Sequence, residues 1–584
     1  MKRIYFIYCL LVGMSSSIYC QNDVPDVTST FALTNANVVV RPGSTLKNTT
    51  VIIKDGYIQQ VGSNLSIPFD AEVIKADSMF IYAGFIAGLS HIGLNKEEDK
   101  TDDNEKVKRY DPPPAAAGIT PDVSVTEMLD SKQKLIEGYR KEGFTLAHVV
   151  PKGRMMAGKG SLIFLSGDSP AEMLLLEDMS LYGSLLASKG RVYPSTTIGV
   201  MSKWRELYKQ AELASQHEKK FMANPKGMER PTYDKSIKSL YVVTSKSIPV
   251  FFDAPKTLDL SRAMTLQKEL GFDMVAANTK QAYKTIDRLK QNNMPVVISL
   301  ELPKAAKDEK KKDEKKDEKK GDEKKDDELE GGENVAKIER TKDGMKKKED
   351  PEMKALKERA NKSKKEYEAQ AANLEQDGIA FSFSVTDTKA GDVKKNIMRM
   401  IKSGLSEDAA LAALTTNPAQ VLGLQQVAGT VEKGKFANLI VTDTTYFNEN
   451  ANIRYVFVDG KKHEFEVKEK KKQKEGDPDA VVDLAGTWTV MISADGMDIG
   501  GTIEMEKSGD DYTGSMTTDM SDKTEFDTVE VDGNNVTIKM TTEMNGGQAP
   551  VVVDIVVDDE EFEGSVNIAN GMMTADVTGS KDPN

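Results

Sequence analysis

Short apolar runs alternate with helix-like segments through the middle of the chain, and this alternation limits the possible folds more than any other feature. The apolar runs of strand length are Phe144–Val150, Pro249–Phe252, Met274–Ala277 and Pro295–Leu300. Segments with helical character, such as Leu260–Leu270 and Gln281–Gln291, lie between them. Strands and helices that alternate at this spacing predict parallel βα units, and therefore an α/β protein.

A second feature is the stretch Tyr82–Leu94, which reads YAGFIAGLSHIGL. An apolar run ends there in glycines and a histidine, as expected of a buried strand whose C-terminal end presents a polar side chain. The stretch resembles the segment PGFID-x-H-x-H, which ends the first barrel strand in the amidohydrolase superfamily. In that family the two histidines hold a catalytic divalent metal. Here the first histidine position is Leu89, and only His91 remains.

The stretch Lys402–Leu424, KSGLSEDAALAALTTNPAQVLGL, resembles the terminal barrel helix and turn of the same superfamily. Its residues also predict a helix directly: Ser406 can cap the N-terminus, and Glu407 and Asp408 favour the first turn. Pro418 lies where that helix should already have ended.

Two distant segments resemble the halves of the small β-sandwich that accompanies the amidohydrolase barrel. Residues 30–82 alternate strand-like runs with turns, including a hairpin signal at Asp55-Gly56. Residues 428–466 contain the closing pattern AGTVEKGKFANLIVTD, with Asn438 where aspartate is usual. The resemblance implies a (β/α)8 TIM barrel over residues 83–427, interrupted only by the charged tract described next, and a composite β-sandwich built from both flanks.

Three segments lie outside this resemblance. Residues 304–365 form a Lys/Glu/Asp-rich tract that buries too little apolar surface to pack, so we expect disorder or a single fluctuating helix. It is either a mobile lid or partner tether, or a solvated low-complexity insertion. Residues 467–480 are a charged linker. Residues 481–584 show short strands with regular turns, which predict an antiparallel β-barrel or sandwich, and they resemble the lipocalin-like modules of secreted bacterial proteins.

The N-terminus predicts export. Residues 1–20 have basic Lys2 and Arg3, an apolar run and then small residues, as in a secretory signal peptide. We expect cleavage after Cys20 and a periplasmic or extracellular protein, with lipid attachment at Cys20 as the alternative. No later stretch is long and apolar enough to predict a transmembrane helix. The net charge of −13 argues against a nucleic-acid partner.

The resemblance also assigns candidate metal ligands. His91 matches the second histidine, and Asp387, after the apolar run beginning at Ile379, matches the late aspartate that would act as the catalytic base. Asp253 and Asn278 stand at the two later histidine positions. A carboxylate at Asp253 and a weak amide oxygen at Asn278 would make an oxygen-rich site, which suits a harder metal than the zinc usual in the family.

Other polar features need no catalytic role. His148 ends a predicted strand and faces either the pocket or the interior, while His217 and His463 lie in a helix and in the sandwich. The run Gly158–Gly167 is a turn followed by a strand, and it lacks the Gly-Lys-Ser/Thr context of a phosphate loop.

Three functions follow as expectations. The resemblance implies hydrolysis of a non-peptide C–N bond in a small cyclic or linear amide, with a lost or altered metal site. The first alternative is a catalytically silent homologue (a pseudoenzyme) that binds a ligand or an intact amidohydrolase partner. The second is an envelope binding protein that uses the C-terminal module.

Overall fold

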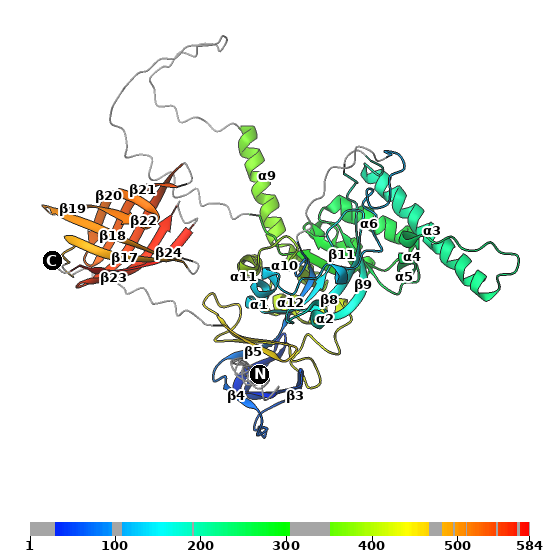
Figure 1. Cartoon of the computed structure of the whole chain (residues 1–584), viewed down its shortest axis with the longest axis horizontal. Helices are drawn as coiled ribbons and strands as arrows, with labels where there is room; N and C mark the ends of the chain where they lie inside the picture. Colours follow the sequence, from blue (N-terminus) through cyan, green and yellow to red (C-terminus); the bar gives the residue numbers. More distant parts are fainter. Residues whose placement is uncertain are drawn as a thin grey trace, which may run out of the picture. The chain divides into compact units, whose positions relative to one another are not determined.

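The computed structural model describes residues 30–95, 108–189, 192–303, 351–465, 480, 482–494, 497–509, 511–544, 547–568 and 573–582 (Figure 1). The expected signal peptide, nearly all of the linker and residues 304–350 of the charged tract lie outside this part. The chain divides into two compact units, Met1–Val467 and Lys468–Asn584. No helix in the described part has the length and apolar character needed to cross a membrane.

The first unit begins and ends in one sheet that joins both flanks of the chain. Its strands are β1 (Thr30–Arg41), β2 (Ser44–Lys54), β3 (Tyr57–Gly62), β4 (Glu72–Lys75), β5 (Phe80–Ala83), β14 (Leu439–Thr442), β15 (Ile453–Val458) and β16 (Lys461–Glu464). Their order is β16-β15-β14-β5-β1-β2-β3.

The strands of both flanks form a single branched sheet. One half of β1 pairs with β4 and the other half pairs with β5, so the strands surround a small core of their own. Leu33, Val51, Leu439 and Phe457 belong to this core and are inaccessible to solvent.

A closed eight-stranded barrel follows, and its strands are largely buried except for the N-terminal half of β9. The strands are β6 (Phe85–Ser90), β7 (Phe144–Val149), β8 (Met156–Phe164), β9 (Leu174–Ser184), β10 (Val250–Asp253), β11 (Met274–Thr279), β12 (Val296–Ser299) and β13 (Phe381–Ser384). Apolar side chains occur on both faces of the barrel strands because the surrounding elements cover the barrel, although some buried side chains are polar. The ring closes where Ser384 pairs with Leu89.

The barrel departs from a regular (β/α)8 barrel at β8, which runs antiparallel to both β7 and β9. The other neighbouring pairs are parallel. A short loop joins β7 to β8 in place of a crossover helix, so the expectation of parallel units throughout is wrong here. Instead of a helix, the segment around Ile119 and Ser124 bridges to β8.

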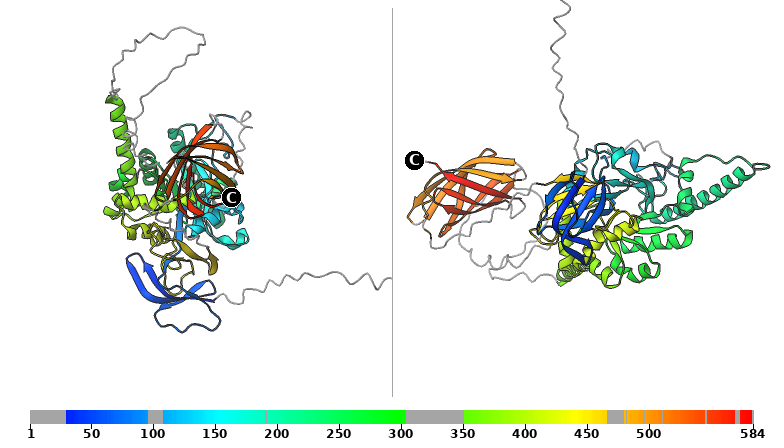
Figure 2. Two further views of the ribbon diagram at one scale, coloured as in Figure 1. Left: turned by 90° about the vertical axis from the view of Figure 1, so that its left-hand side faces the viewer. Right: turned by 90° about the horizontal axis from the view of Figure 1, so that it is seen from below.

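The helices of the first unit follow the barrel strands (Figure 2). They are α1 (Lys134–Lys141), α2 (Pro170–Met173), α3 (Thr197–Ala223), α4 (Lys235–Ser239), α5 (Tyr241–Thr244), α6 (Thr257–Leu270), α7 (Ile286–Gln291), α9 (Pro351–Glu368), α10 (Gln370–Gln376), α11 (Val393–Lys402), α12 (Glu407–Leu414) and α13 (Thr416–Val421). The part of the charged tract beyond residue 350 is thus helical.

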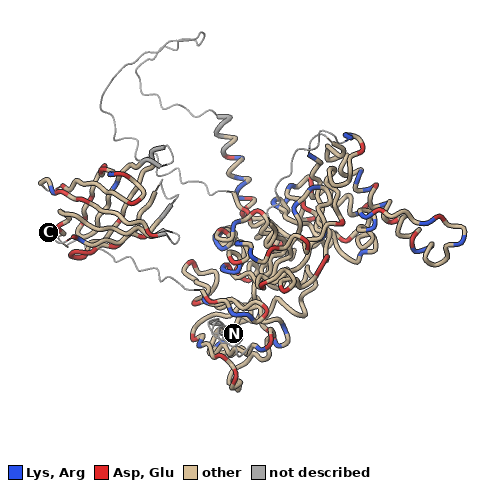
Figure 3. Tube along the Cα trace, in the orientation of Figure 1, with Lys and Arg blue, Asp and Glu red and all other residues tan. Residues whose placement is uncertain are grey.

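The second unit is a closed antiparallel barrel in which each strand pairs with the next. Its strands are β17 (Gly486–Ala494), β18 (Met497–Ser508), β19 (Asp511–Thr518), β20 (Ser521–Asp532), β21 (Asn535–Met544), β22 (Gly547–Asp558), β23 (Glu561–Ile568) and β24 (Met573–Lys581). Buried side chains such as Trp488, Ile503, Ile538 and Val553 pack into its core. Acidic residues dominate the charges along its trace (Figure 3).

Candidate functional site

A cavity of about 270 Å³ lies at the C-terminal ends of the first unit's barrel strands. The four ligand positions predicted from the sequence, His91, Asp253, Asn278 and Asp387, all line it. They come from different strands: His91 follows β6, Asp253 ends β10, Asn278 is the second-last residue of β11, and Asp387 follows β13. In barrels of this kind, the C-terminal ends of the strands carry the functional groups.

His91 is held in one tautomer by the backbone. Its Nδ1 lies 2.7 Å from the carbonyl oxygen of Val150, and because a carbonyl oxygen only accepts, Nδ1 carries the proton. Burial lowers the pKa of His91, although the Val150 hydrogen bond opposes this. The neutral ring therefore keeps Nε2 as a hydrogen-bond acceptor.

Asp253 and Asn278 each hold an unsatisfied oxygen. The Oδ1 atoms of both side chains are buried, and neither has a hydrogen-bond partner in the described part of the chain. Burial, and then the charge of Asp387, raise the pKa of the Asp253 carboxyl to about 7. Asn278 has a φ of 52°, in the left-handed region that asparagine tolerates better than most residues.

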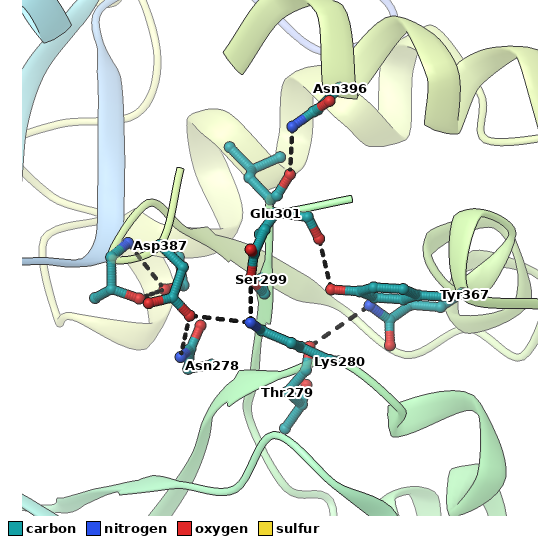
Figure 4. A network of polar contacts seen from close by, with 12 residues as sticks. Asn278, Thr279, Lys280, Ser299, Glu301, Tyr367, Asp387 and Asn396 are labelled. Carbon is teal, nitrogen blue, oxygen red and sulfur yellow. Dashed lines mark hydrogen bonds and ion pairs between the residues drawn. The ribbon is translucent and has the colours of Figure 1, made fainter. Parts of the chain in front are cut away.

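Lys280 places a positive charge directly against Asp387 (Figure 4). Its Nζ lies 3.1 Å from Asp387 Oδ2 and also contacts the Glu301 carboxylate. Asn278 Nδ2 donates to the same Asp387 oxygen at 3.2 Å. Burial lowers the pKa of Lys280, but its bonds with Glu301 and Asp387 outweigh this effect and raise the pKa overall. Lys280 therefore stays charged.

Helix α9 supports this arrangement from the far side of Glu301. The Tyr367 hydroxyl donates to the Glu301 backbone oxygen at 2.5 Å. Burial raises the pKa of Tyr367 to about 12, so this hydroxyl keeps its proton at neutral pH.

Two lysines and a tyrosine that line this cavity were not predicted from the sequence. Lys280 stands two residues after Asn278, a strand-like spacing that would have placed both side chains on one face. Lys152 reaches the cavity because the unexpected β7–β8 hairpin has its loop there. Tyr182, in β9, packs edge-on to His91 with ring centroids 6.4 Å apart. No motif in the sequence marks Lys152 or Tyr182.

The donor set does not fit the zinc site of the resembled family. Leu89, at the first histidine position, is fully buried and aliphatic. Lys280 already neutralises Asp387, the best-matched carboxylate. In the described residues, no three His, Cys, Asp or Glu side chains are grouped closely enough to hold a metal.

The remaining histidines lie away from the cavity. His148 is fully buried inside the barrel, where Nε2 meets Ser180 Oγ at 2.8 Å, and burial lowers its pKa to about 4. His463 contacts Arg140 and Ser166 where β16 meets the barrel. His217 lies in α3.

Comparison with known proteins supports the family resemblance. Residues 263–462 match the model of the amidohydrolase family. These residues include β11 to β13 and the strands that return to the first sheet. This part of the chain is therefore similar to the amidohydrolase family. No curated protein matches the chain.

Solved structures were found that align with about three quarters of the chain. An amidohydrolase from Thermotoga maritima MSB8 aligns with a TM-score of 0.56 at 22% identity, over 74% of this chain and 99% of that one. A putative prolidase from Bifidobacterium longum aligns with a TM-score of 0.43 at 14% identity, over 75% of this chain and 95% of that one. The similarity to the Thermotoga structure supports the fold assignment and says nothing about function.

Proposed function

We propose that the chain is a catalytically silent amidohydrolase homologue whose barrel cavity binds a small ligand without a metal. The observation that carries this proposal is the contact between Lys280 and Asp387, 3.1 Å from Nζ to Oδ2. A hydrolytic site of this class needs a divalent cation to lower the pKa of a bound water, and a free carboxylate to accept its proton. Here the carboxylate that matches the family base is bonded to an ammonium group of the same chain.

The electrostatic cost of placing a metal ion beside Lys280 supports the proposal of a metal-free site. An ammonium group beside a carboxylate weakens the binding of a metal ion there, because two cations at that spacing repel. A metal that displaced Lys280 would also break its contact with Glu301. It would gain no nitrogen ligand from Leu89.

Metal titration of the purified chain tests the proposal. We expect no stoichiometric zinc or manganese by elemental analysis, and no hydrolysis of small cyclic or linear amides after either metal is added. Lys280→Met should bind either metal more tightly than the wild type, because it leaves Asp387 without its cation. Lys284→Met removes an exposed lysine of the same segment and should change nothing.

Two results would contradict the proposal. One is a stoichiometric metal in the wild-type protein together with amide hydrolysis that is lost in Asp387→Asn. The other is equal metal affinity of the wild type and Lys280→Met, which would mean that Lys280 does not weaken metal binding at the site.

We also propose that the protein is exported. The support is the signal-like composition of residues 1–20. Mass spectrometry of the protein from a fractionated host should give an N-terminus at Gln21 in the periplasmic or extracellular fraction. An intact Met1 in the cytoplasmic fraction would contradict this.

A further inference from the structure

We propose that the ligand of this cavity is a small zwitterion, whose ammonium group bonds to Asp253 and Asn278 and whose carboxylate pairs with Lys152. The inference rests on the proposed function in taking the cavity as a binding site, and it adds the chemical class of the ligand.

Two buried acceptor oxygens in this cavity lack a hydrogen-bond donor. Asn278 is only 6% exposed, and its Oδ1 and the Asp253 Oδ1 both lack partners in the described part of the chain. A buried acceptor without a donor is energetically unfavourable. Two such acceptors in residues that line one cavity favour a ligand with more than one N–H, as a primary ammonium group has.

Charge selects a cation at this floor. Asp387 is paired with Lys280, but no lysine, arginine or histidine of the described residues forms an ion pair with Asp253. The carboxyl groups of Asp253 and Asp387 both line the cavity and Lys280 pairs with only one of them, so negative charge here is only partly compensated. An ammonium group relieves that imbalance, and an anion would worsen it.

The rim of the cavity, in contrast, carries a positive charge that favours an anionic group. Lys152 lies on the β7–β8 loop, is exposed, and forms no hydrogen bond or ion pair with another described residue. A ligand that carried only positive charge would be repelled by it. A carboxylate on the same ligand would pair with it, and a cavity of about 270 Å³ is below the usual range for drug-sized molecules, so the ligand is small.

Calorimetry on the full chain in excess EDTA tests the proposal. The probes are glycine, β-alanine and 4-aminobutyrate, which space the two charges differently, with ethylamine and propionate as single-charge controls. We expect at least one zwitterion to bind more tightly than both controls. Asp253→Asn should weaken its binding at least tenfold, and Lys152→Gln should reduce its affinity toward that of ethylamine.

Matched controls separate local from general effects. Asp287→Asn and Lys226→Gln change exposed residues outside the cavity and should leave binding unchanged. Circular dichroism should show that Asp253→Asn is folded; Lys152→Gln changes an exposed loop residue and provides a second test if it is not.

Three outcomes would overturn the inference: no zwitterion binds, propionate or ethylamine binds as tightly as the best zwitterion, or folded Asp253→Asn binds like the wild type. EDTA removes metal ions, so zwitterion binding in its presence would support this inference even if metal analysis showed that the site is catalytically active. If no zwitterion binds, this inference fails, but the metal and hydrolysis measurements that test the proposed function are unaffected.

Discussion

Glu142 shows at the residue scale how burial at the end of α1 sets a pH dependence. Burial raises the pKa of Glu142 to about 7, although Lys394 and Lys395 oppose this. The Tyr446 hydroxyl donates to the Glu142 backbone oxygen at 3.3 Å, which fixes this end of the helix. The folded protein therefore binds this proton more tightly than the unfolded chain does.

The first prediction concerns Glu142→Gln. Because the folded pKa is raised, the stabilising contribution is complete below the ordinary pKa near 4.5 and is lost as the pH rises to about 7. The variant avoids this loss, so its melting temperature should exceed the wild type by more at pH 8 than at pH 5. The gain in free energy of unfolding at pH 8 should be on the order of 2 kcal/mol.

Glu137→Gln in the same helix is the control with the opposite sign. The hydrogen bond and ion pair with Lys141 lower the pKa of Glu137, so its small contribution exists above the ordinary pKa and is lost in acid. A pH-independent difference between Glu142→Gln and the wild type would refute the role of Glu142.

The turn between α11 and α12 shows at the element scale how one side chain begins a helix. Ser406 Oγ accepts from the Ala409 amide at 3.1 Å and donates to Glu375 Oε1 at 2.5 Å. The helix ends at Leu414, before Pro418, as expected from the sequence. Pro418 instead lies within the separate helix α13.

The second prediction is that Ser406→Ala lowers the free energy of unfolding by about 1 kcal/mol, because it removes the N-cap of α12. Urea unfolding of the first unit, followed by circular dichroism, measures this. Ser403→Ala, three residues earlier, removes a hydroxyl without a capping bond and should cost much less. Equal losses in the two variants would show that the cap contributes nothing.

At the scale of the whole molecule, each unit encloses a core of its own, and each contains one of the two tryptophans. Trp204 is buried in the first unit, near Phe252 and Phe272. Trp488 is buried in the second, where its Nε1 donates to the Leu484 oxygen at 3.0 Å. Intrinsic fluorescence can therefore report on each unit separately.

The third prediction uses this pair of natural reporters. In Trp488→Phe, fluorescence follows only the first unit, and in Trp204→Phe only the second. We expect different urea midpoints in the two variants, because the cores differ in size and the units unfold independently. As a check, circular dichroism of the wild type should show both transitions. A single shared midpoint by every probe would mean that the two units unfold as one.

Much of the fold could be predicted because it depends on local signals. The hairpin at Asp55-Gly56 forms as expected, with both residues at positive φ and β2 paired with β3. The reversal at β8 could not be predicted, since its apolar sequence suits either strand direction. It depends on pairing with β7 and β9 and on the bridging segment near Ile119.

The candidate site was predictable only where the family pattern marks a position. His91, Asp253, Asn278 and Asp387 line one cavity because each lies at or near a strand end. The spacing from Asn278 could have indicated Lys280, but its contact with Asp387 and the place of Lys152 on the hairpin loop could not be predicted from the sequence. Lys280 changes the proposed function of the site, because it contacts the Asp387 carboxylate that would otherwise be available as a metal ligand.

The pairing of β13 with β6 has a consequence for synthesis of the chain. Ser384 pairs with Leu89, which is synthesised much earlier. The barrel can therefore close only after the whole charged tract has been synthesised. Hairpins such as β7–β8 join neighbours in sequence and can form on the nascent chain, whereas such distant contacts form slowly. Until β13 emerges, the apolar edges of β6 and β12 stay open to chaperones and to other chains.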